Sequence, residues 1–302
     1  MLHVTIRQLK VFESVAKYLS FTRAAEELHL SQPAVSMQIK QLEEQVGLQL
    51  LEQIGKKNYL TEAGREILHY SREILNLLDE AEEVVNDLSG VKRGTLQIAV
   101  ATTANEFATQ LLAAFSKLHG GIKYKLDVTN REALLAELVN NETDLVIMGR
   151  PPRELKLVTE PFMDNPLIVI APPDHPLLSQ GKISLQLLQE ETFVVREKVS
   201  GTRIAVERFL MQHGVNMNFS MEMTSNEAIK QAVQAGLGLG IVSAHTVRLE
   251  LETGRLAVLD VDKFPILRHW YLVHKEGKRL SSVAKEFHQF VLDKAEQFST
   301  IL

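Results

Sequence analysis

The strongest constraint on the fold is one uninterrupted helical pattern that runs from Thr61 to Leu88. Thr61 is a suitable N-cap, and the helix is expected to end near Gly90. About 28 residues at 1.5 Å per residue make a rod of roughly 42 Å. Its apolar positions alternate spacings of three and four, as in a heptad seam: Ile67, Tyr70, Ile74, Leu77, Ala81, Val84 and Leu88.

An isolated rod cannot bury such a seam within its own chain, so the pattern predicts a homodimer through this helix. The alternative is a long helix packed on its own domain. The net charge of −5 comes mainly from the same segment, because residues 61–90 hold two basic and eight acidic residues. Residues 1–60 hold seven basic and six acidic residues, so the total charge does not exclude DNA binding by that part.

At 302 residues the chain is long enough for two or three domains. The absence of cysteine excludes a disulfide framework, a thiolate metal site and a cysteine nucleophile, and it favours a reducing compartment. No basic start leads into an apolar stretch, and no run approaches the ~18 apolar residues that a membrane span requires. We therefore expect a cytoplasmic protein without membrane contact.

Residues 5–48 have apolar spacings near 3.6 with short breaks, which predicts a compact unit of three helices. The third helix has Ser31 as its N-cap and Pro33 in its first turn. Two short helices joined by a tight turn are typical of a helix-turn-helix that enters the major groove. A plain three-helix bundle is the alternative. The polar residues left on the outer side of the third helix, with Met37 beside them, are Gln32, Ser36 and Lys40.

Residues 50–60 predict a hairpin with Gly55-Lys56 near its tip, which would be the wing of a winged helix. Lys56 and Lys57 would then lie beside a phosphate backbone, whereas the alternative is two solvated lysines on a turn. The DNA-binding domain is therefore expected to span residues 1–60, with the dimerising linker helix at 61–90.

From Gly94 onward, short apolar strands alternate with helical segments, which predicts largely parallel sheets with helices on their faces. The expected strands are 96–100, 124–128, 145–148, 167–171 and 239–242. The expected helices are 107–118, 131–140, 203–213, 226–235 and 282–298. Two Pro-rich stretches, 161–166 and 265–268, indicate paired crossings between two sheets. We expect a two-lobed, periplasmic-binding-protein-like α/β domain at 91–302, with lobe I at 91–163 and 267–302 and lobe II at 164–266.

No enzyme signature is present: the sequence lacks Gly-x-Ser-x-Gly, a Walker A loop and His-Glu-x-x-His, and its ten histidines show no ligand spacing. The Gly236-Leu-Gly238-Leu-Gly240 run lies where a helix ends and a strand begins, so helix termination explains it. We expect no catalytic residue, no metal and no bound cofactor.

One hydroxyl-rich or amide-rich turn, at 102–105, follows the first strand of one lobe, and another, at 200–203, opens a helix in the other lobe. Helix N-termini present unpaired N–H groups and partial positive charge. Open α/β sheets bind ligands at the carboxyl ends of their strands, so these turns predict an anion site, with arginines supplying bidentate charge. Each turn taken singly is an ordinary helix cap in the alternative interpretation. The candidate residues are Thr102, Thr103, Asn105, Asn130, Arg131, Gly149, Arg150, Ser200, Gly201, Thr202, Arg203 and Asn226.

The N-terminal residues resemble the winged-helix signature of LysR-type transcriptional regulators in order, spacing and residue type. The matching stretches include Ser20-Phe-Thr-Arg-Ala-Ala25, Ser31-Gln-Pro-Ala-Val-Ser36 and Leu60-Thr-Glu-Ala-Gly64. Met148-Gly-Arg-Pro-Pro152 and Gly201-Thr-Arg203 resemble, in particular, the branch that regulates autotrophic carbon fixation, the CbbR-like regulators.

The resemblance implies a transcriptional activator that binds double-stranded DNA as a homotetramer, a dimer of dimers, with contact to RNA polymerase. It also implies a small co-inducer, either a phosphorylated sugar or acid or NADPH. Met37 stands where the family often has Arg, and we expect it to pack against a thymine methyl. The candidate DNA-contacting residues are Thr22, Arg23, Ser31, Gln32, Pro33, Ser36, Met37, Lys40, Lys56 and Lys57.

Two other functions compete with this interpretation. A transport-type solute-binding protein could use the same two-lobed domain, but it would require export and would not need a DNA-type N-terminus. A LysR-type regulator of another regulon, for amino acids, aromatic compounds or stress, would keep the same architecture. The absence of cysteine argues against thiol-based peroxide sensing.

Overall fold

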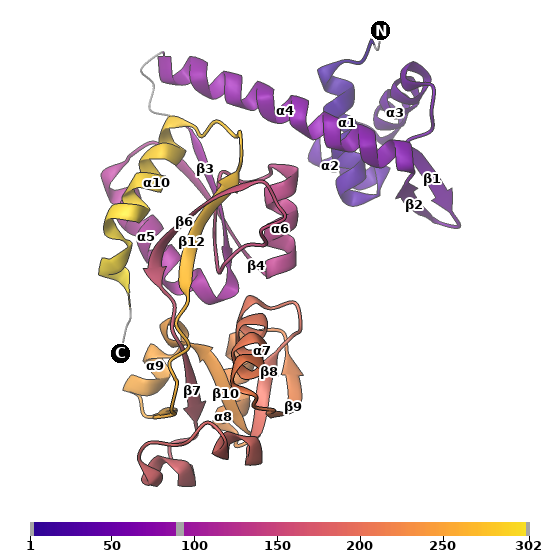
Figure 1. Cartoon of the computed structure of the whole chain (residues 1–302). Helices are drawn as coiled ribbons and strands as arrows, with labels where there is room; N and C mark the ends of the chain where they lie inside the picture. Colours follow the sequence, from indigo (N-terminus) through magenta and orange to yellow (C-terminus); the bar gives the residue numbers. More distant parts are fainter. Residues whose placement is uncertain (1–2, 89–93, 300–302) are drawn as a thin grey trace. The chain divides into compact units, whose positions relative to one another are not determined.

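The computed structural model describes residues 3–88 and 94–299, and the chain divides into two units, Met1–Val91 and Lys92–Leu302 (Figure 1). The expected helix end near Gly90 lies outside the described residues, as does the side chain of Leu88. Within the described ranges, no helix combines the length and the apolar character needed to cross a bilayer.

The first unit begins with three helices, α1 (Ile6–Tyr18), α2 (Phe21–Glu27) and α3 (Gln32–Val46). Each starts at a hydroxyl N-cap, because the side chains of Thr5, Ser20 and Ser31 accept a hydrogen bond from a backbone N–H in the first turn. The helices pack against one another through the apolar faces that the spacing predicts. The side chains on these faces are each less than one tenth exposed: Leu9, Phe12, Val15, Ala16, Ala24, Ala25, Val35, Ile39 and Leu42. The predicted helical unit is confirmed.

A two-stranded hairpin follows, formed by β1 (Leu51–Ile54) and β2 (Lys57–Leu60) in antiparallel register. The linker helix α4 (Glu62–Leu88) begins directly after it, and Thr61 Oγ1 accepts a hydrogen bond from the Gly64 N–H at 2.9 Å. The winged helix and the long helix are therefore both present as the sequence predicts.

The linker helix has two apolar faces rather than one. Leu68 and Leu75 are buried within the first unit, together with Ser71. Part of the predicted seam lies on the other side: Tyr70, Ile74 and Leu77 are 59%, 44% and 63% exposed, respectively. Ile67, the first residue of that seam, is instead half-buried and packs against the unit's own core. The first turns of α4 therefore pack on this core, while Tyr70, Ile74 and Leu77 remain available at the surface.

Gly64 lets the first turn of α4 lie close to the backbone of Leu50, the residue before β1. Substitution of Gly64 by alanine should therefore destabilise the first unit. A Cβ atom at Gly64 would lie 2.0 Å from the carbonyl oxygen of Leu50, a backbone atom that cannot move away cheaply. We expect Gly64→Ala to lower the unfolding free energy by about 1–3 kcal/mol, despite the higher helix propensity of alanine. Circular dichroism melting checks this, with Gly120→Ala as the control, because nothing lies within 4 Å of a Cβ at Gly120. Equal melting temperatures for the two variants would contradict the packing argument.

The second unit has two five-stranded sheets, each with helices on its faces (Figure 1). We call lobe I the part built on the sheet of order β4-β3-β5-β12-β6. Its strands are β3 (Thr95–Ala101), β4 (Lys123–Thr129), β5 (Leu145–Met148), β6 (Leu157–Asp164) and β12 (His269–Lys275). Its helices are α5 (Asn105–Leu118), α6 (Arg131–Asn140) and α10 (Ser282–Lys294). Trp270, Phe107, Phe115 and Phe287 are the largest fully buried side chains of its core.

Lobe II is the part built on the sheet of order β11-β7-β10-β8-β9. Its strands are β7 (Leu167–Ala171), β8 (Thr192–Arg196), β9 (Asn218–Met223), β10 (Leu239–Ser243) and β11 (Ala257–Leu259). Its helices are α7 (Gly201–His213), α8 (Asn226–Gln234) and the short α9 (Arg248–Glu252). All five predicted strands and all five predicted helices of the second unit are present, together with strands that the apolar runs did not reveal.

The sheets are mixed, so the expectation of largely parallel sheets needs correction. Strand β12 runs antiparallel to β5 and β6, and β7 runs antiparallel to β10 and β11. The antiparallel pairs arise because the chain leaves lobe I through β6 and returns through β12. At these crossings the Asn165 N–H donates to the Arg268 carbonyl oxygen at 2.7 Å, and Leu167 pairs with Ile266. The two Pro-rich stretches therefore lie side by side between the lobes.

Candidate functional site

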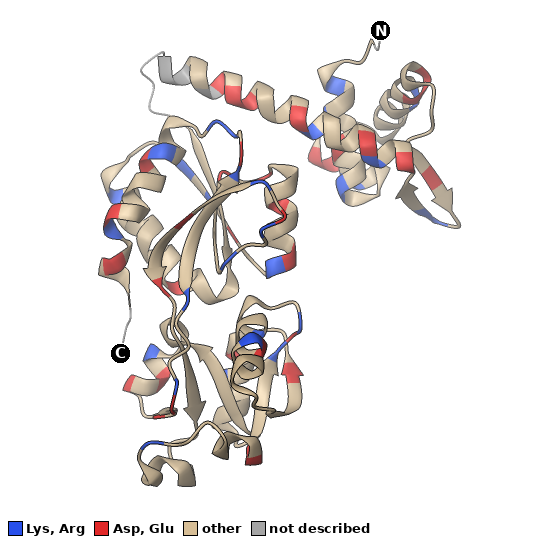
Figure 2. Ribbon diagram, viewed as in Figure 1, with Lys and Arg blue, Asp and Glu red and all other residues tan. Residues whose placement is uncertain are grey.

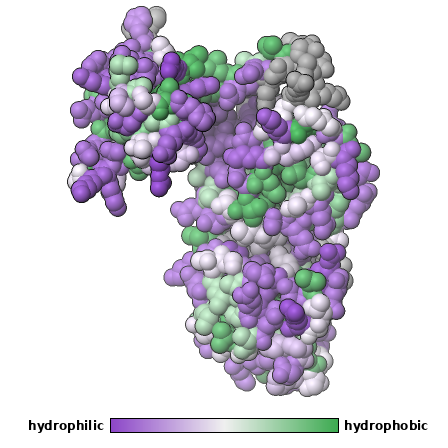
Figure 3. Space-filling view, turned by 180° about the vertical axis from the view of Figure 1, so that it is seen from behind, coloured by the Kyte–Doolittle hydropathy of each residue, from purple (hydrophilic) through white to green (hydrophobic). Residues whose placement is uncertain are grey.

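The exposed face of α3 carries the residues that the sequence singled out for DNA contact. Ser31, Gln32, Pro33, Ser36, Met37 and Lys40 are all exposed, because the opposite face of the helix is buried in the core. Most of the first unit's visible surface in Figure 3 is hydrophilic. An exposed helix end with small polar side chains has the dimensions and the hydrogen-bonding groups to read base edges in a major groove.

The second helix and the wing place basic side chains on the same unit. Thr22 and Arg23 at the start of α2 are exposed, and so are Lys56 and Lys57 in the hairpin. Figure 2 colours the basic positions of this unit blue, including part of the hairpin. The wing is fixed to the helices by Asn58, whose Nδ2 donates to the Leu19 carbonyl oxygen at 3.0 Å. These cations can neutralise phosphates on either side of the helix end.

A small pocket lies between the lobes of the second unit, with a volume of about 40 Å³. It forms where β3 and β4 of lobe I end and where α7 of lobe II begins. The structure brings eight of the predicted anion-site residues together there: Thr102, Thr103, Asn130, Arg131, Gly149, Ser200, Gly201 and Thr202. We call this the interlobe pocket.

Helix N-termini from both lobes meet at the interlobe pocket. Asn130 Oδ1 accepts from the Ala133 N–H at 2.9 Å at the start of α6, and Ser200 Oγ accepts from the Thr202 N–H at 3.2 Å at the start of α7. The other first-turn N–H groups of a helix lack intrahelical acceptors and carry the positive end of the dipole. The pocket therefore presents partial positive charge from opposite sides.

Arg131 reaches from lobe I to the helix end of lobe II. A Cβ atom added at Gly201 would lie 3.7 Å from Nη1 of Arg131, so the guanidinium lies against the first turn of α7. Burial lowers the pKa of Arg131, since the charged form loses solvation there. A full positive charge beside a positive helix end is unfavourable alone, and a bound anion would stabilise both.

Arg268 is the main residue of the site that the sequence interpretation missed. Its Nε donates to the Asn165 carbonyl oxygen at 3.2 Å, and its Nη2 lies 3.3 Å from both Asn165 Oδ1 and Thr202 Oγ1. No carboxylate in the described part of the chain forms an ion pair with it. Desolvation, and then the nearby charge of Arg196, lower the pKa of Arg268 to about 9. The sequence signal that could have identified it is its position at the end of the second Pro-rich stretch, where the chain crosses between the two predicted lobes.

The indole of Trp270 adds a further donor at the same place. Trp270 lines the interlobe pocket and is 1% exposed, yet its Nε1 has no hydrogen-bond acceptor among the described residues. Buried donors are nearly always paired, so this one calls for an acceptor that the protein itself does not provide. No acidic side chain lines the pocket within the described ranges. Its lining therefore combines positive charge with hydrogen-bond donors.

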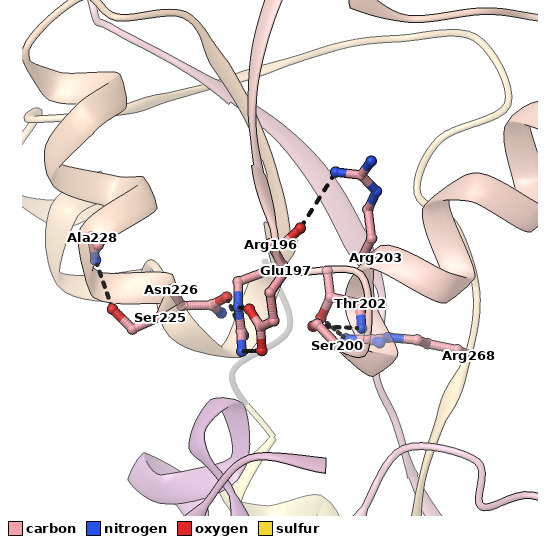
Figure 4. A network of polar contacts seen from close by, with 9 residues as sticks. All are labelled: Arg196, Glu197, Ser200, Thr202, Arg203, Ser225, Asn226, Ala228 and Arg268. Atoms are coloured by element: carbon pink, nitrogen blue, oxygen red, sulfur yellow. Dashed lines mark hydrogen bonds and ion pairs between the residues drawn. The ribbon is translucent and has the colours of Figure 1, made fainter. Parts of the chain in front are cut away.

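Arg196 also lines the pocket, but it is already paired (Figure 4). Its guanidinium forms an ion pair with Glu197 at 2.7 Å, and its Nη1 donates to Asn226 Oδ1 at 3.2 Å. Asn226 was predicted as a ligand contact. The structure places it behind Arg196, where it positions that guanidinium and donates to Thr246 Oγ1 at 3.3 Å.

Arg203 differs most from the prediction, because its guanidinium turns away from the interlobe pocket (Figure 4). It forms an ion pair with Glu207, donates to the Arg196 carbonyl oxygen at 3.4 Å and lies 4.1 Å from the ring centre of Phe219. Arg203 is thus 8% exposed and joins α7 to the sheet of lobe II.

Two further predicted residues lie outside the interlobe pocket. Asn105 starts α5, and its Oδ1 accepts from Thr109 Oγ1 at 3.3 Å. Arg150 is exposed and lines a larger, adjoining groove instead.

Comparison with protein families gives two matches that together span nearly the whole chain. Residues 6–65 match "Bacterial regulatory helix-turn-helix protein, lysR family". Residues 89–296 match "LysR substrate binding domain". The first match covers the winged helix, and the second covers both lobes.

Curated relatives match over almost their full length. The RuBisCO operon transcriptional regulator of Allochromatium vinosum is 59% identical over 294 residues, which cover 97% of each chain. The HTH-type transcriptional activator CmpR of Synechocystis sp. is 46% identical and covers 99% of this chain and 98% of its own. The HTH-type transcriptional regulator CbbR of Rhodospirillum rubrum is 45% identical and covers 95% of each.

Solved structures match the two-lobed part and the whole fold. The regulatory domain of Synechocystis CcmR in complex with 2-phosphoglycolate (2-PG) is 42% identical with a TM-score of 0.65, and covers 67% of this chain and 98% of its own. CbnR, a LysR family transcriptional regulator, has a TM-score of 0.69 at 20% identity over 97% of this chain and 99% of its own, which supports the fold.

Proposed function

This chain belongs to the LysR family of DNA-binding transcriptional regulators, and from that premise we propose that it controls carbon-dioxide fixation genes in the cytoplasm in response to a small anion. The observation that carries the proposed regulon is the 59% identity with a RuBisCO operon regulator over 97% of both chains. The names of these relatives describe regulators, which agrees with the prediction that the chain is not an enzyme.

The proposed ligand of the interlobe pocket is a small phosphorylated acid, with 2-phosphoglycolate as the first choice. The pocket offers Arg131, Arg268, the Trp270 Nε1–H and helix N-termini, all of which are donors or positive charges. Its volume of about 40 Å³ favours a compact ligand over NADPH. The CcmR regulatory domain, a 42% identical neighbour, is the one described with 2-PG.

A thermal-shift panel of phosphorylated acids and sugars, NADPH and aromatic acids tests this proposal. Ligand at ~100 times its dissociation constant adds about 2.7 kcal/mol of stability, worth a few degrees for a domain of this size. We expect a shift with 2-phosphoglycolate and none with aromatic acids. A shift with an aromatic acid alone would contradict both the ligand class and the proposed regulon.

The proposed mechanism uses the fact that the pocket draws residues from both lobes. A ligand that contacts Arg131 of lobe I and the start of α7 in lobe II favours the arrangement in which these groups are close. Only the difference in ligand affinity between two arrangements can shift the protein from one to the other. The shift would change how the assembled regulator holds its DNA.

For DNA recognition we propose that α3 enters the major groove while the wing contacts phosphates. Gln32→Ala should weaken binding to the specific operator by roughly 1–3 kcal/mol while leaving non-specific binding nearly unchanged. Lys57→Ala is the matched control, since loss of a phosphate contact weakens both kinds of binding and reduces the salt dependence. Fluorescence anisotropy on operator and shuffled duplexes measures this. An equal loss on both duplexes for Gln32→Ala would show that the recognition helix is assigned wrongly.

The exposed seam of α4 leads us to propose a homodimer through the linker helix, and a homotetramer built from two such dimers. Regulators of this family are typically oligomeric. Tyr70, Ile74 and Leu77 lie on one side of α4 at heptad spacing, opposite the buried Leu68 and Leu75. A second copy of the helix is the occupant that this repeat fits.

A further inference from the structure

Asn165 lies directly after β6, in the first of the two crossings between the lobes, and it is 0% exposed. Its Oδ1 accepts from Ser243 Oγ, at the end of β10, at 2.7 Å and from Arg268 Nη2, in the second crossing, at 3.3 Å. The backbones of the crossings also pair, since the Asn165 N–H donates to the Arg268 carbonyl oxygen. Asn165 therefore holds Arg268 through both its backbone and its side chain.

These contacts direct the Arg268 guanidinium toward the interlobe pocket. Its Nε donates to the Asn165 carbonyl oxygen at 3.2 Å, and its Nη2 also donates to Thr202 Oγ1 at 3.3 Å, in the first turn of α7 (Figure 4). Arg268 and Thr202 both line the pocket. A guanidinium has five N–H donors, and the two on Nη1 have no acceptor among the residues that the structure describes. They remain for a ligand.

Asn165 is an amide at a position where a carboxylate would fit. Its Oδ1 accepts both hydrogen bonds, whereas its buried Nδ2 has no acceptor in the described part of the chain. An aspartate of nearly the same shape would keep both contacts of Oδ1, lose no hydrogen bond and add a negative charge beside the guanidinium. Because an unpaired buried donor is unfavourable, stability alone does not favour asparagine here.

No other residue supplies the missing negative charge. The neighbouring carboxylate, Asp164, has a 59% exposed side chain and lies 3.3 Å from His269 Nε2. Glu197, which is near the pocket, forms its ion pair with Arg196. Within residues 3–88 and 94–299, Arg268 has no ion-pair partner. Its charge is therefore left for whatever enters the pocket.

We propose that Asn165 sets the anion affinity of the interlobe pocket: it positions Arg268 by hydrogen bonds and, because it is neutral, leaves the positive charge of Arg268 to the ligand. This inference rests on the proposed function of the pocket as an anion site. Asn165 is a positioning residue, since it does not line the pocket and acts on the ligand through Arg268. An aspartate at this position would be an internal counter-ion that competes with the ligand.

The test compares Asn165→Asp with Asn165→Leu in the full-length protein. Calorimetric titration measures 2-phosphoglycolate binding, and circular dichroism measures melting without ligand. We expect Asn165→Asp to weaken binding about tenfold or more and to melt at or above the wild-type temperature. Asn165→Leu loses both contacts of Oδ1 without adding a charge, so it should melt at a lower temperature. Asn216→Asp is the control, because it adds the same charge at an exposed position of lobe II outside the pocket.

Melting without ligand separates the effect of charge from a structural defect. Wild-type affinity in Asn165→Asp would overturn the inference. So would weaker binding in Asn165→Asp that comes with a melting temperature as low as that of Asn165→Leu, because Asn165 would then have only a structural role. If the wild type itself binds no phosphorylated acid, the proposed ligand is wrong. The melting temperatures then decide the inference alone, since a carboxylate paired with Arg268 keeps the variant at or above the wild type and an unpaired one lowers it.

Discussion

Replacing Arg131 by glutamine should reduce the thermal shift with 2-phosphoglycolate to about half or less while leaving the fold and DNA binding unchanged. The guanidinium lies at the first turn of α7 without a carboxylate partner in the described part of the chain, so a bound anion is its natural counter-charge. Loss of a charge-assisted hydrogen bond costs about 1.5–3 kcal/mol, which weakens binding by roughly tenfold to a hundredfold. Titration calorimetry with 2-phosphoglycolate measures this directly.

Arg203→Ala provides the matched comparison, because it removes the same charge from α7 itself, the helix whose first turn Arg131 of α6 approaches. Arg203 is engaged by Glu207, the Arg196 carbonyl oxygen and Phe219. We expect this variant to melt at a lower temperature without ligand and still to respond to 2-phosphoglycolate. A lost response in Arg203→Ala together with a retained response in Arg131→Gln would reverse the assignment of the two arginines.

Substitution of the exposed α4 seam should disrupt the oligomer. The double substitution Ile74→Asp and Leu77→Asp should halve the mass of the assembly and lower operator affinity by about a hundredfold or more. Both side chains are exposed on α4, so the monomer fold should tolerate the change. In a helix pair, however, each aspartate would place an unpaired charge in an apolar seam, which costs several kcal/mol. The paired DNA-binding units would then separate.

Sedimentation velocity and anisotropy on a full operator check this prediction. Leu249→Asp serves as the control, since Leu249 on α9 is 67% exposed and lies outside the linker helix. An unchanged mass in the double variant would mean that the dimer forms elsewhere, and that the heptad seam has another role.

Local features of the sequence were sufficient to predict the first unit. Its helices begin at hydroxyl caps, and their apolar spacings match the buried faces. The wing needed only a glycine at its tip, where Gly55 adopts a φ of 65°. Each of these signals acts within a few residues, which is the range that periodicity and capping can describe.

The second unit was predicted less completely, since its sheets depend on pairing across long separations. The apolar runs identified central strands such as β5 and β10, which are buried throughout. Edge strands such as β9 are only partly buried and lack a continuous apolar run. The direction of β12 depends on its partner β6, more than one hundred residues away, which no local pattern shows.

The candidate site, too, was predictable from local sequence only in part. The turns that the sequence singled out contain Thr102, Thr103 and Ser200, and all three residues line one pocket. Side-chain direction was not predictable: Arg203 points into lobe II, whereas Arg268 comes from a crossing segment and reaches Thr202. Arg268 lies at the pocket only because the two lobes pack around its crossing segment, and this packing is visible only in the folded chain.

We propose that a small phosphorylated anion in the interlobe pocket controls how this regulator binds a carbon-fixation promoter. The most direct test is footprinting of the full-length protein on the promoter of a RuBisCO operon, with and without 2-phosphoglycolate. We predict a specific footprint whose boundaries or occupancy change with the ligand, and an unresponsive footprint with Arg131→Gln. A footprint that the ligand does not change, although the ligand binds, would contradict the claim, as would the absence of specific binding to that promoter.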